Sequence, residues 1–153
     1  MINKESPKKY KKYWKIIVAF SVFLGIIFPI YGVYNDYKEE RDYQKMIEDS
    51  LQSIQMDISS GLFDKAFEGI VALENKFNGS EKPDIIADLE YKKGVCYYNF
   101  SQRVNGGENS RDENLDKALI SFSKALKVYS KEKYPAEYAS TNTNIGVIYA
   151  TFS

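Results

Sequence analysis

One octapeptide occurs twice in this chain, and the repetition limits the folds that the chain can adopt. It reads GVCYYNFS at Gly94–Ser101 and GVIYATFS at Gly146–Ser153, with five of eight residues identical. A second phrase, Asp-Lys-Ala, stands at 64–66 and again at 116–118, so both phrases recur at the same offset of 52 residues. A fixed offset is typical of repeat architectures, in which each unit buries its apolar face against the next unit.

The residues around the two phrases carry the period of a helix. Apolar residues recur at intervals of three and four within Phe63–Leu73 and within Leu115–Tyr129, so each set forms one stripe on a helix. Two end signals accompany them: Ser59-Ser60-Gly61 is a natural stop, and Ser110-x-x-Glu113 is a capping box. No stretch alternates long enough to predict a strand, so the sequence predicts an all-α fold. The expected helices after the first part of the chain are 38–59, 62–77, 84–104, 112–132 and 136–153.

The small residues of the two phrases are expected to mark contacts between helices. In a stacked helical hairpin, two helices approach most closely where their side chains are smallest, and large residues one turn away fill the surrounding space. The distance from Ala66 to Gly94 is 28 residues, and the distance from Ala118 to Gly146 is again 28. The extra length between the units is therefore confined to one loop, at Arg103–Asn114. The residues expected to pack the repeats together are Ala66, Gly94, Tyr97, Ala118, Phe122, Ala125, Gly146 and Tyr149.

This pattern resembles the tetratricopeptide repeat (TPR) family. The matching positions of one unit are Gly94, Tyr97, Ala118, Phe122, Ala125 and Pro135, and Gly146 with Tyr149 open the next unit. Residues 47–77 resemble a degenerate preceding unit. The resemblance implies an α-solenoid of antiparallel helix hairpins. The sequence departs from the family at Glu90 and Lys93, which stand where the first helix of a TPR usually carries tryptophan and leucine.

The resemblance also implies a binding surface. TPR arrays usually bind peptides or helices in a concave groove lined by the first helix of each hairpin. Carried over to this chain, the groove positions are Asp88, Tyr91, Val95, Tyr98, Asn99, Ser140, Thr143, Val147 and Thr151. Chaperone-binding TPRs use lysine and asparagine where this chain has Tyr91 and Val95, so no such carboxylate clamp is expected. Tyr91 and Tyr98 either contact a partner or are ordinary half-exposed tyrosines.

The amino-terminal region carries a different signal. Ile16–Tyr34 is a run of nineteen residues without a charge, and a helix of that length nearly spans the roughly 30 Å hydrocarbon core of a membrane. Before it, Glu5 is the one acid beside six lysines, so the positive-inside rule keeps the amino terminus in the cytoplasm. We therefore expect a basic cytoplasmic tail at 1–15, a single-pass transmembrane helix at 16–34 and a repeat domain at 35–153 on the outer side of the cell membrane. The alternatives are a signal peptide cleaved near Tyr34, which would release a secreted protein, or a buried core helix.

The composition argues against an enzyme. The chain has 21 basic and 21 acidic residues, which gives no nucleic-acid signature. It has no histidine and one cysteine, Cys96, so it lacks the commonest general base, the commonest transition-metal ligand and any cysteine-rich zinc site. We expect no catalytic residue, no metal, no cofactor and no small-molecule substrate. Cys96 is expected to be buried and inert.

Together these features predict a membrane-anchored TPR-type scaffold that binds a partner peptide or helix in a concave groove. The alternative is the stalk or sensory fragment of a longer signalling or enzymatic protein, whose effector domain lies beyond Ser153. Truncation is expected because the helix that contains Gly146 has no second helix after it and ends on apolar residues. The heavy use of lysine, asparagine, isoleucine and tyrosine indicates a bacterial source.

Overall fold

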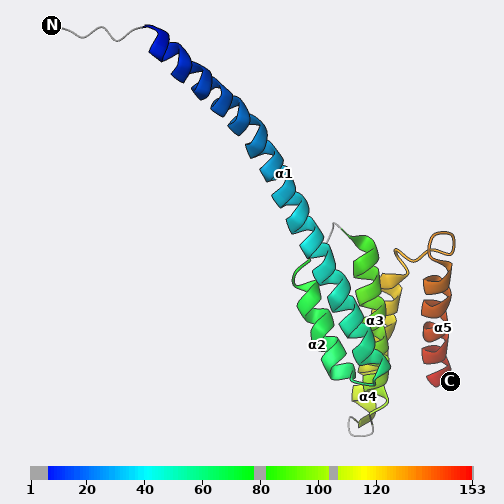
Figure 1. The fold of residues 1–153 in the computed structure, drawn as a ribbon. Coiled ribbons are helices and arrows are strands. Elements are labelled where there is room, and N and C mark those ends of the chain that lie inside the picture. Colours follow the sequence, from blue (N-terminus) through cyan, green and yellow to red (C-terminus); the bar gives the residue numbers. More distant parts are fainter. Residues whose placement is uncertain (1–6, 78–81, 104–106, 153) are drawn as a thin grey trace. The chain divides into compact units, whose positions relative to one another are not determined.

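The computed structural model describes residues 7–77, 82–103 and 107–152, with the backbone alone for 7–19, 26 and 107–109. The regular elements of these residues are all helices, which confirms the all-α prediction (Figure 1). They are α1 (Pro7–Ser59), α2 (Phe63–Glu74), α3 (Pro83–Ser101), α4 (Gly107–Ala125) and α5 (Pro135–Thr151). The chain divides into two compact units, Met1–Met46 and Ile47–Ser153.

The first unit contains α1 up to Met46, with Pro29 inside the helix. Large apolar side chains are exposed along it: Phe20, Phe23 and Phe28 are 63%, 59% and 72% exposed. The start of the expected basic tail, and the side chains of 16–19 and 26 in the expected span, lie outside the described residues. Within the described part of the chain, no helix has an apolar stretch long enough to cross a membrane.

The end of α1 confirms the predicted stop signal. The helix ends at Ser59, and Gly61 adopts a positive φ of 74°, a conformation that glycine reaches without steric cost. The N–H of Gly61 donates to the carbonyl of Ile58, and the N–H of Leu62 donates to the carbonyl of Asp57 at 2.8 Å. These bonds satisfy carbonyl groups that the helix end would otherwise leave unpaired.

The bounds of α4 differ from the prediction at both ends. Because the helix begins at Gly107, Ser110 lies inside it, and the predicted capping box at Ser110 and Glu113 is wrong. The helix ends at Ala125 rather than at 132. The N–H groups of Lys127 and Val128 donate to carbonyls three residues back, so the chain tightens into a turn after α4.

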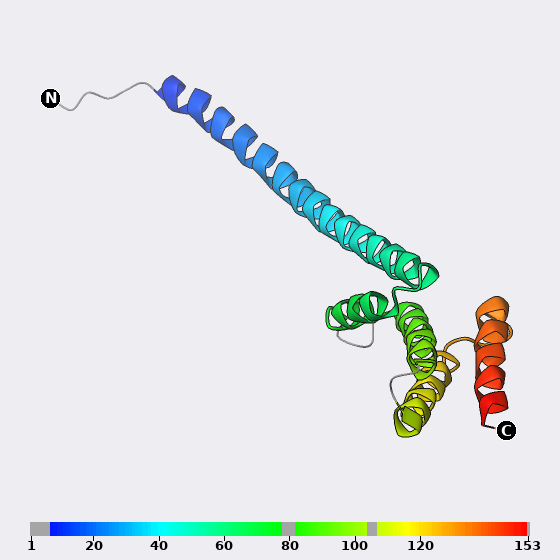
Figure 2. The ribbon, with the colours of Figure 1, turned by 90° about the horizontal axis from the view of Figure 1, so that it is seen from below.

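α3 and α4 lie side by side and form the most extensive contact among the described helices (Figures 1 and 2). Gly94 on α3 permits this approach, because a Cβ at this position would lie 2.6 Å from Cε1 of Phe122. Phe122 is 1% exposed and belongs to a core cluster with Leu115, Ala118 and Ile148. The aromatic ring that covers Gly94 therefore comes from one turn after the alanine of the repeated phrase.

The first hairpin, formed by the end of α1 and α2, uses the same device with the roles exchanged. Here the glycine is on the second helix: a Cβ at Gly69 would lie 3.0 Å from Cγ1 of Ile54 on α1. Ile54 is 2% exposed, and Ala66, the alanine of the first Asp-Lys-Ala phrase, is fully buried, as is Ala118 in the second phrase. Each hairpin thus seats one large side chain against one glycine of the opposite helix.

α5 packs against α4 through part of its surface. Ile148 is fully buried in the cluster with Phe122, and Ile145 packs against the same cluster. Gly146 has open space where a Cβ would stand, and Tyr149 is 60% exposed. Of the residues expected to pack the repeats together, these two are the ones that the structure leaves on the surface.

Candidate functional site

A cavity of about 170 Å³ lies where α3, the turn after α4 and the start of α5 meet. Three residues that the groove prediction named, Asp88, Tyr91 and Ser140, are brought together in its wall. The remaining lining residues are Tyr129, Ala136 and Glu137, which the prediction missed. We call this feature the α3–α5 cavity.

Tyr91 connects the two helices that border the cavity. Its ring lies 5.7 Å, between centroids, from the ring of Phe122 in the core. Its hydroxyl accepts a hydrogen bond of 3.2 Å from Nδ2 of Asn144 on α5. Tyr91 is therefore held by packing at one end and by a hydrogen bond at the other, which fixes its place in the cavity wall.

The cavity wall carries two carboxylates. Asp88 on α3 accepts a hydrogen bond of 2.6 Å from the Nζ atom of Lys92, one turn later on the same helix. Glu137 lies in the first turn of α5, and among the described residues its carboxylate has no hydrogen bond or ion pair. Asp88 is thus partly neutralised within the chain, whereas Glu137 is not.

Tyr129 is the buried member of the cavity wall, with 5% of its surface exposed. Its ring packs 5.4 Å from that of Tyr134. Burial raises the pKa of the Tyr129 hydroxyl above its ordinary value, and the carboxylates of Asp88 and Glu137 raise the pKa further because they disfavour a phenolate. The hydroxyl is therefore a neutral group in a region of negative potential.

The other predicted groove residues do not line the cavity. Val95 and Tyr98 are partly buried and pack against the core cluster of Phe122, so part of each side chain serves the fold. Asn99 donates from Nδ2 to the carbonyl of Val95, and Thr143 donates from Oγ1 to the carbonyl of Ala139, each within its own helix. Val147 and Thr151 are exposed on α5. Three of the predicted groove residues therefore line the cavity, and the others lie elsewhere on α3 and α5.

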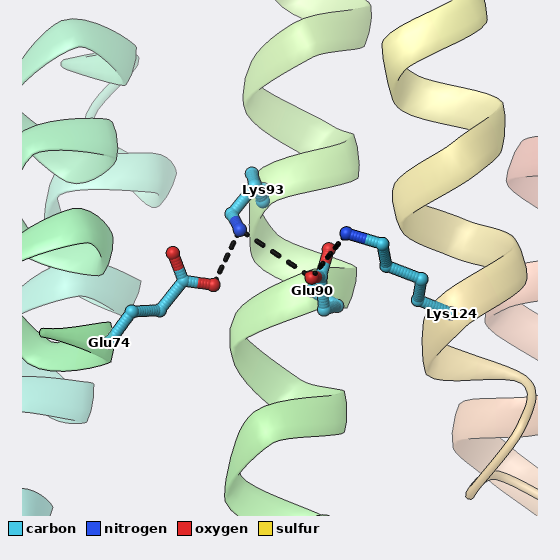
Figure 3. A network of polar contacts seen from close by, with 4 residues as sticks. All are labelled: Glu74, Glu90, Lys93 and Lys124. Carbon is cyan, nitrogen blue, oxygen red and sulfur yellow. Dashed lines mark hydrogen bonds and ion pairs between the residues drawn. The ribbon is translucent and has the colours of Figure 1, made fainter. Parts of the chain in front are cut away.

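Glu90 and Lys93, the positions that depart from the TPR pattern, form an ion network that joins three helices (Figure 3). Lys93 on α3 pairs with Glu74 of α2 and, at 3.6 Å, with Glu90. The Oε1 atom of Glu90 also accepts a hydrogen bond of 3.0 Å from Nζ of Lys124 on α4. Glu90 is 8% exposed, so charged contacts replace the apolar packing that a TPR has at this place.

Cys96 is fully buried in α3. Burial raises the pKa of its thiol to about 11, so at neutral pH the group is protonated and poorly nucleophilic. This placement agrees with the prediction of a buried, inert side chain.

One of the missed residues, Glu137, had a signal in the sequence, and Tyr129 did not. Glu137 stands three residues before Ser140, so both lie on one face of α5, and a groove that includes Ser140 extends to Glu137. Tyr129 was assigned to the apolar stripe of the preceding helix. Its place in the cavity depends on the turn after Ala125, and no local pattern announces that turn.

Comparisons of this chain with protein-family models, with curated proteins and with solved structures found no match. The resemblance to the TPR family therefore stays a prediction made from the repeated residues.

Proposed function

We propose that this chain binds a segment of a protein partner along a groove between α3 and α5, and that residues 16–34 anchor it in a membrane. One observation carries the first part. Asp88 and Tyr91 from α3 and Ser140 from α5, named as groove residues from the repeat pattern, line a single cavity. In this proposal the helical hairpins are TPR-like units, and the first helices of two successive units supply the binding surface.

The size and the lining of the α3–α5 cavity favour a protein segment over a small-molecule substrate. At about 170 Å³ it is smaller than the roughly 300–1,000 Å³ that is usual for ligand pockets. Its wall combines carboxylates, tyrosine hydroxyls, a serine and an alanine, a mixture that suits hydrogen bonding and apolar contact with a side chain. We therefore propose a binding role and no catalysis.

The mechanism is recognition by a largely preformed surface. The hydrogen bond between Tyr91 and Asn144, and the shared core cluster around Phe122, connect α3 to α5 before any partner arrives. A surface that is ordered in advance loses little conformational entropy on binding, so more of the contact energy remains as affinity.

The membrane part of the proposal is supported by the amino-terminal sequence. Ile16–Tyr34 contains no charged residue, and its described large side chains, among them Phe23 and Phe28, are exposed. A helix that is apolar on all sides is stable in a large core or in lipid. With six lysines before the span, residues 35–153 lie on the outer side, and the anchor raises the concentration of the binding surface near partners in the same membrane.

Site-specific photo-crosslinking in intact cells tests the binding role. A photoreactive amino acid at Ser140, which lines the α3–α5 cavity, is expected to capture one discrete partner protein. The matched control places the same residue at Ser123, which is exposed on α4. Equal capture at both positions, or none at Ser140, would contradict the proposed groove.

Extraction of membranes at alkaline pH tests the anchor. The full-length chain is expected to stay in the membrane pellet, and the double variant Leu24→Arg, Ile27→Arg is expected to move to the supernatant, because each arginine costs about 2.5–3.5 kcal/mol at the centre of a membrane helix. The pair Lys38→Arg, Lys45→Arg, outside the span, is the control. A wild-type chain found entirely in the supernatant would exclude the membrane anchor. It would not affect the proposed binding groove, which the crosslinking experiment tests separately.

A further inference from the structure

The α3–α5 cavity has the chemistry of a site for a positively charged side chain. Two carboxylates, Asp88 and Glu137, stand in its wall, and one own-chain cation, Lys92, pairs with Asp88. The carboxylate of Glu137 has no hydrogen bond or ion pair among the described residues. The cavity therefore has an excess of negative charge that its own residues do not neutralise.

A second, independent observation concerns Tyr129. The residue is 5% exposed and lines the cavity, and within the described part of the chain its hydroxyl has no hydrogen bond. Because this residue lines the cavity, a ligand there can supply a polar partner for the hydroxyl. An ammonium or guanidinium group donates hydrogen bonds, and the phenolic oxygen of Tyr129 can accept one.

The remaining wall suits the aliphatic part of such a side chain. The methyl group of Ala136 and the ring of Tyr91 line the same cavity, and an aromatic face attracts a cation that lies over it. Lysine and arginine bury their methylene stems against apolar surface while the charged head stays with polar groups. The cavity volume of about 170 Å³ leaves room for one such side chain rather than for a backbone segment.

We propose that the α3–α5 cavity receives a lysine or arginine side chain of the partner segment, with Glu137 as its counter-ion and the Tyr129 hydroxyl as an acceptor. This inference rests on the proposed function and specifies the chemistry of the partner. Asp88 is already paired with Lys92, so Glu137 supplies the negative charge that attracts the partner's cation.

The test uses the full-length chain in lipid nanodiscs and a phage-displayed library of random peptides. Selected peptides are first required to block crosslinking from Ser140, which establishes that they occupy the groove. We expect them to share one lysine or arginine, and replacing that residue by glutamine is expected to weaken binding about tenfold.

The protein side of the same contact is tested with Glu137→Gln, Tyr129→Phe and the control Glu132→Gln, which removes an exposed carboxylate outside the cavity. Glu137→Gln is expected to weaken binding about tenfold and Tyr129→Phe severalfold, while Glu132→Gln has no effect. In the Glu137→Gln variant, replacing the basic peptide residue is expected to weaken binding little further, because the two substitutions remove the same ion pair. Thermal unfolding of each variant shows whether the fold is retained.

Four results would overturn the inference. Groove-blocking peptides without a shared basic residue, or with affinity unchanged by Glu137→Gln, would refute it and leave the proposed function standing. Free spermidine that binds as tightly as the peptides, and depends on Glu137, would make the ligand a polyamine rather than a protein side chain. A library that yields no peptide able to block Ser140 would refute the proposed function and this inference together.

Discussion

The two copies of the octapeptide have nearly the same sequence and different surroundings. In the first copy Gly94 is buried beneath the ring of Phe122, and Tyr97 packs 5.1 Å from Phe67 of α2. In the second copy Gly146 has open space beside it, and Tyr149 is 60% exposed. The residue two places after each glycine, Cys96 or Ile148, is fully buried in both copies.

The repeated residues allow close helix packing at both places, but a neighbouring helix fills the space beside only one of the two glycines. α3 has neighbours on two sides, α2 and α4, whereas α5 contacts α4 through Ile145 and Ile148. A glycine lets another helix approach, but it contributes to stability only when a large side chain fills the space it leaves. Substitutions at matched positions of the two copies should therefore have different effects on stability.

The largest effect is expected from Phe122→Ala. This change removes a fully buried ring that contacts both Gly94 and the core cluster, so the free energy of unfolding should fall by about 3–5 kcal/mol. The measurement is alkylation of the buried Cys96 along a urea series, because this thiol reacts when the second unit unfolds. Phe152→Ala, at a ring that is 49% exposed, is the control and should stay within about 0.5 kcal/mol of wild type.

Gly94→Ala should have the next largest effect. The new Cβ would lie 2.6 Å from Cε1 of the confined Phe122 ring, and such overpacking should lower the free energy of unfolding by about 2–3 kcal/mol in the same assay. Adding Phe122→Leu should restore part of the loss, because the smaller side chain leaves room for the methyl group. A double variant less stable than either single variant would show that Phe122 is not what Gly94 accommodates.

Glu90→Gln should cost less, about 1–2 kcal/mol. The substitution keeps the size of the side chain but removes the charge that pairs with Lys93 and accepts a hydrogen bond from Lys124. Asn142 occupies the same place in the second copy and is exposed, so Asn142→Ala should leave unfolding almost unchanged. If Glu90→Gln and Asn142→Ala lowered the free energy of unfolding equally, the ion network would not stabilise the first copy more than the second.

Gly146→Ala should have the smallest effect and the opposite sign. Among the described residues, nothing beyond its own helix turn lies within 4 Å of the Cβ position. Because alanine is also preferred over glycine inside a helix, the free energy of unfolding should rise by up to about 1 kcal/mol. The same urea series measures it. A loss comparable to that of Gly94→Ala would indicate that another helix covers this face in solution.

Much of the fold could be predicted from local patterns. The apolar stripes located α2, α3 and α5 to within a few residues, and Ser59-Ser60-Gly61 marked the end of α1. The bounds of α4 were not predicted correctly. A serine such as Ser110 can cap the start of a helix or lie within its first turns, and the local sequence does not distinguish the two.

The candidate site could be predicted only in part. The resemblance to the TPR family implied groove positions at Asp88, Tyr91 and Ser140, and these three line the α3–α5 cavity. Tyr129 and Glu137 were missed, since their meeting depends on the turn after α4 and on how α5 is placed against α3. Likewise, the sequence shows Glu90 and Lys93 only as departures from the TPR pattern. The structure shows that they pair with Lys124 and Glu74 of neighbouring helices.

The amino-acid sequence alone specifies a helical chain, small residues that recur at one offset, and an uncharged run at Ile16–Tyr34. These are properties of residue type and spacing, which are local. Only the tertiary structure decided that Gly94 is covered and Gly146 is not, and which carboxylates meet Tyr129. Burial and electrostatic environment depend on the helix that packs opposite, and residues far apart in the chain supply that helix.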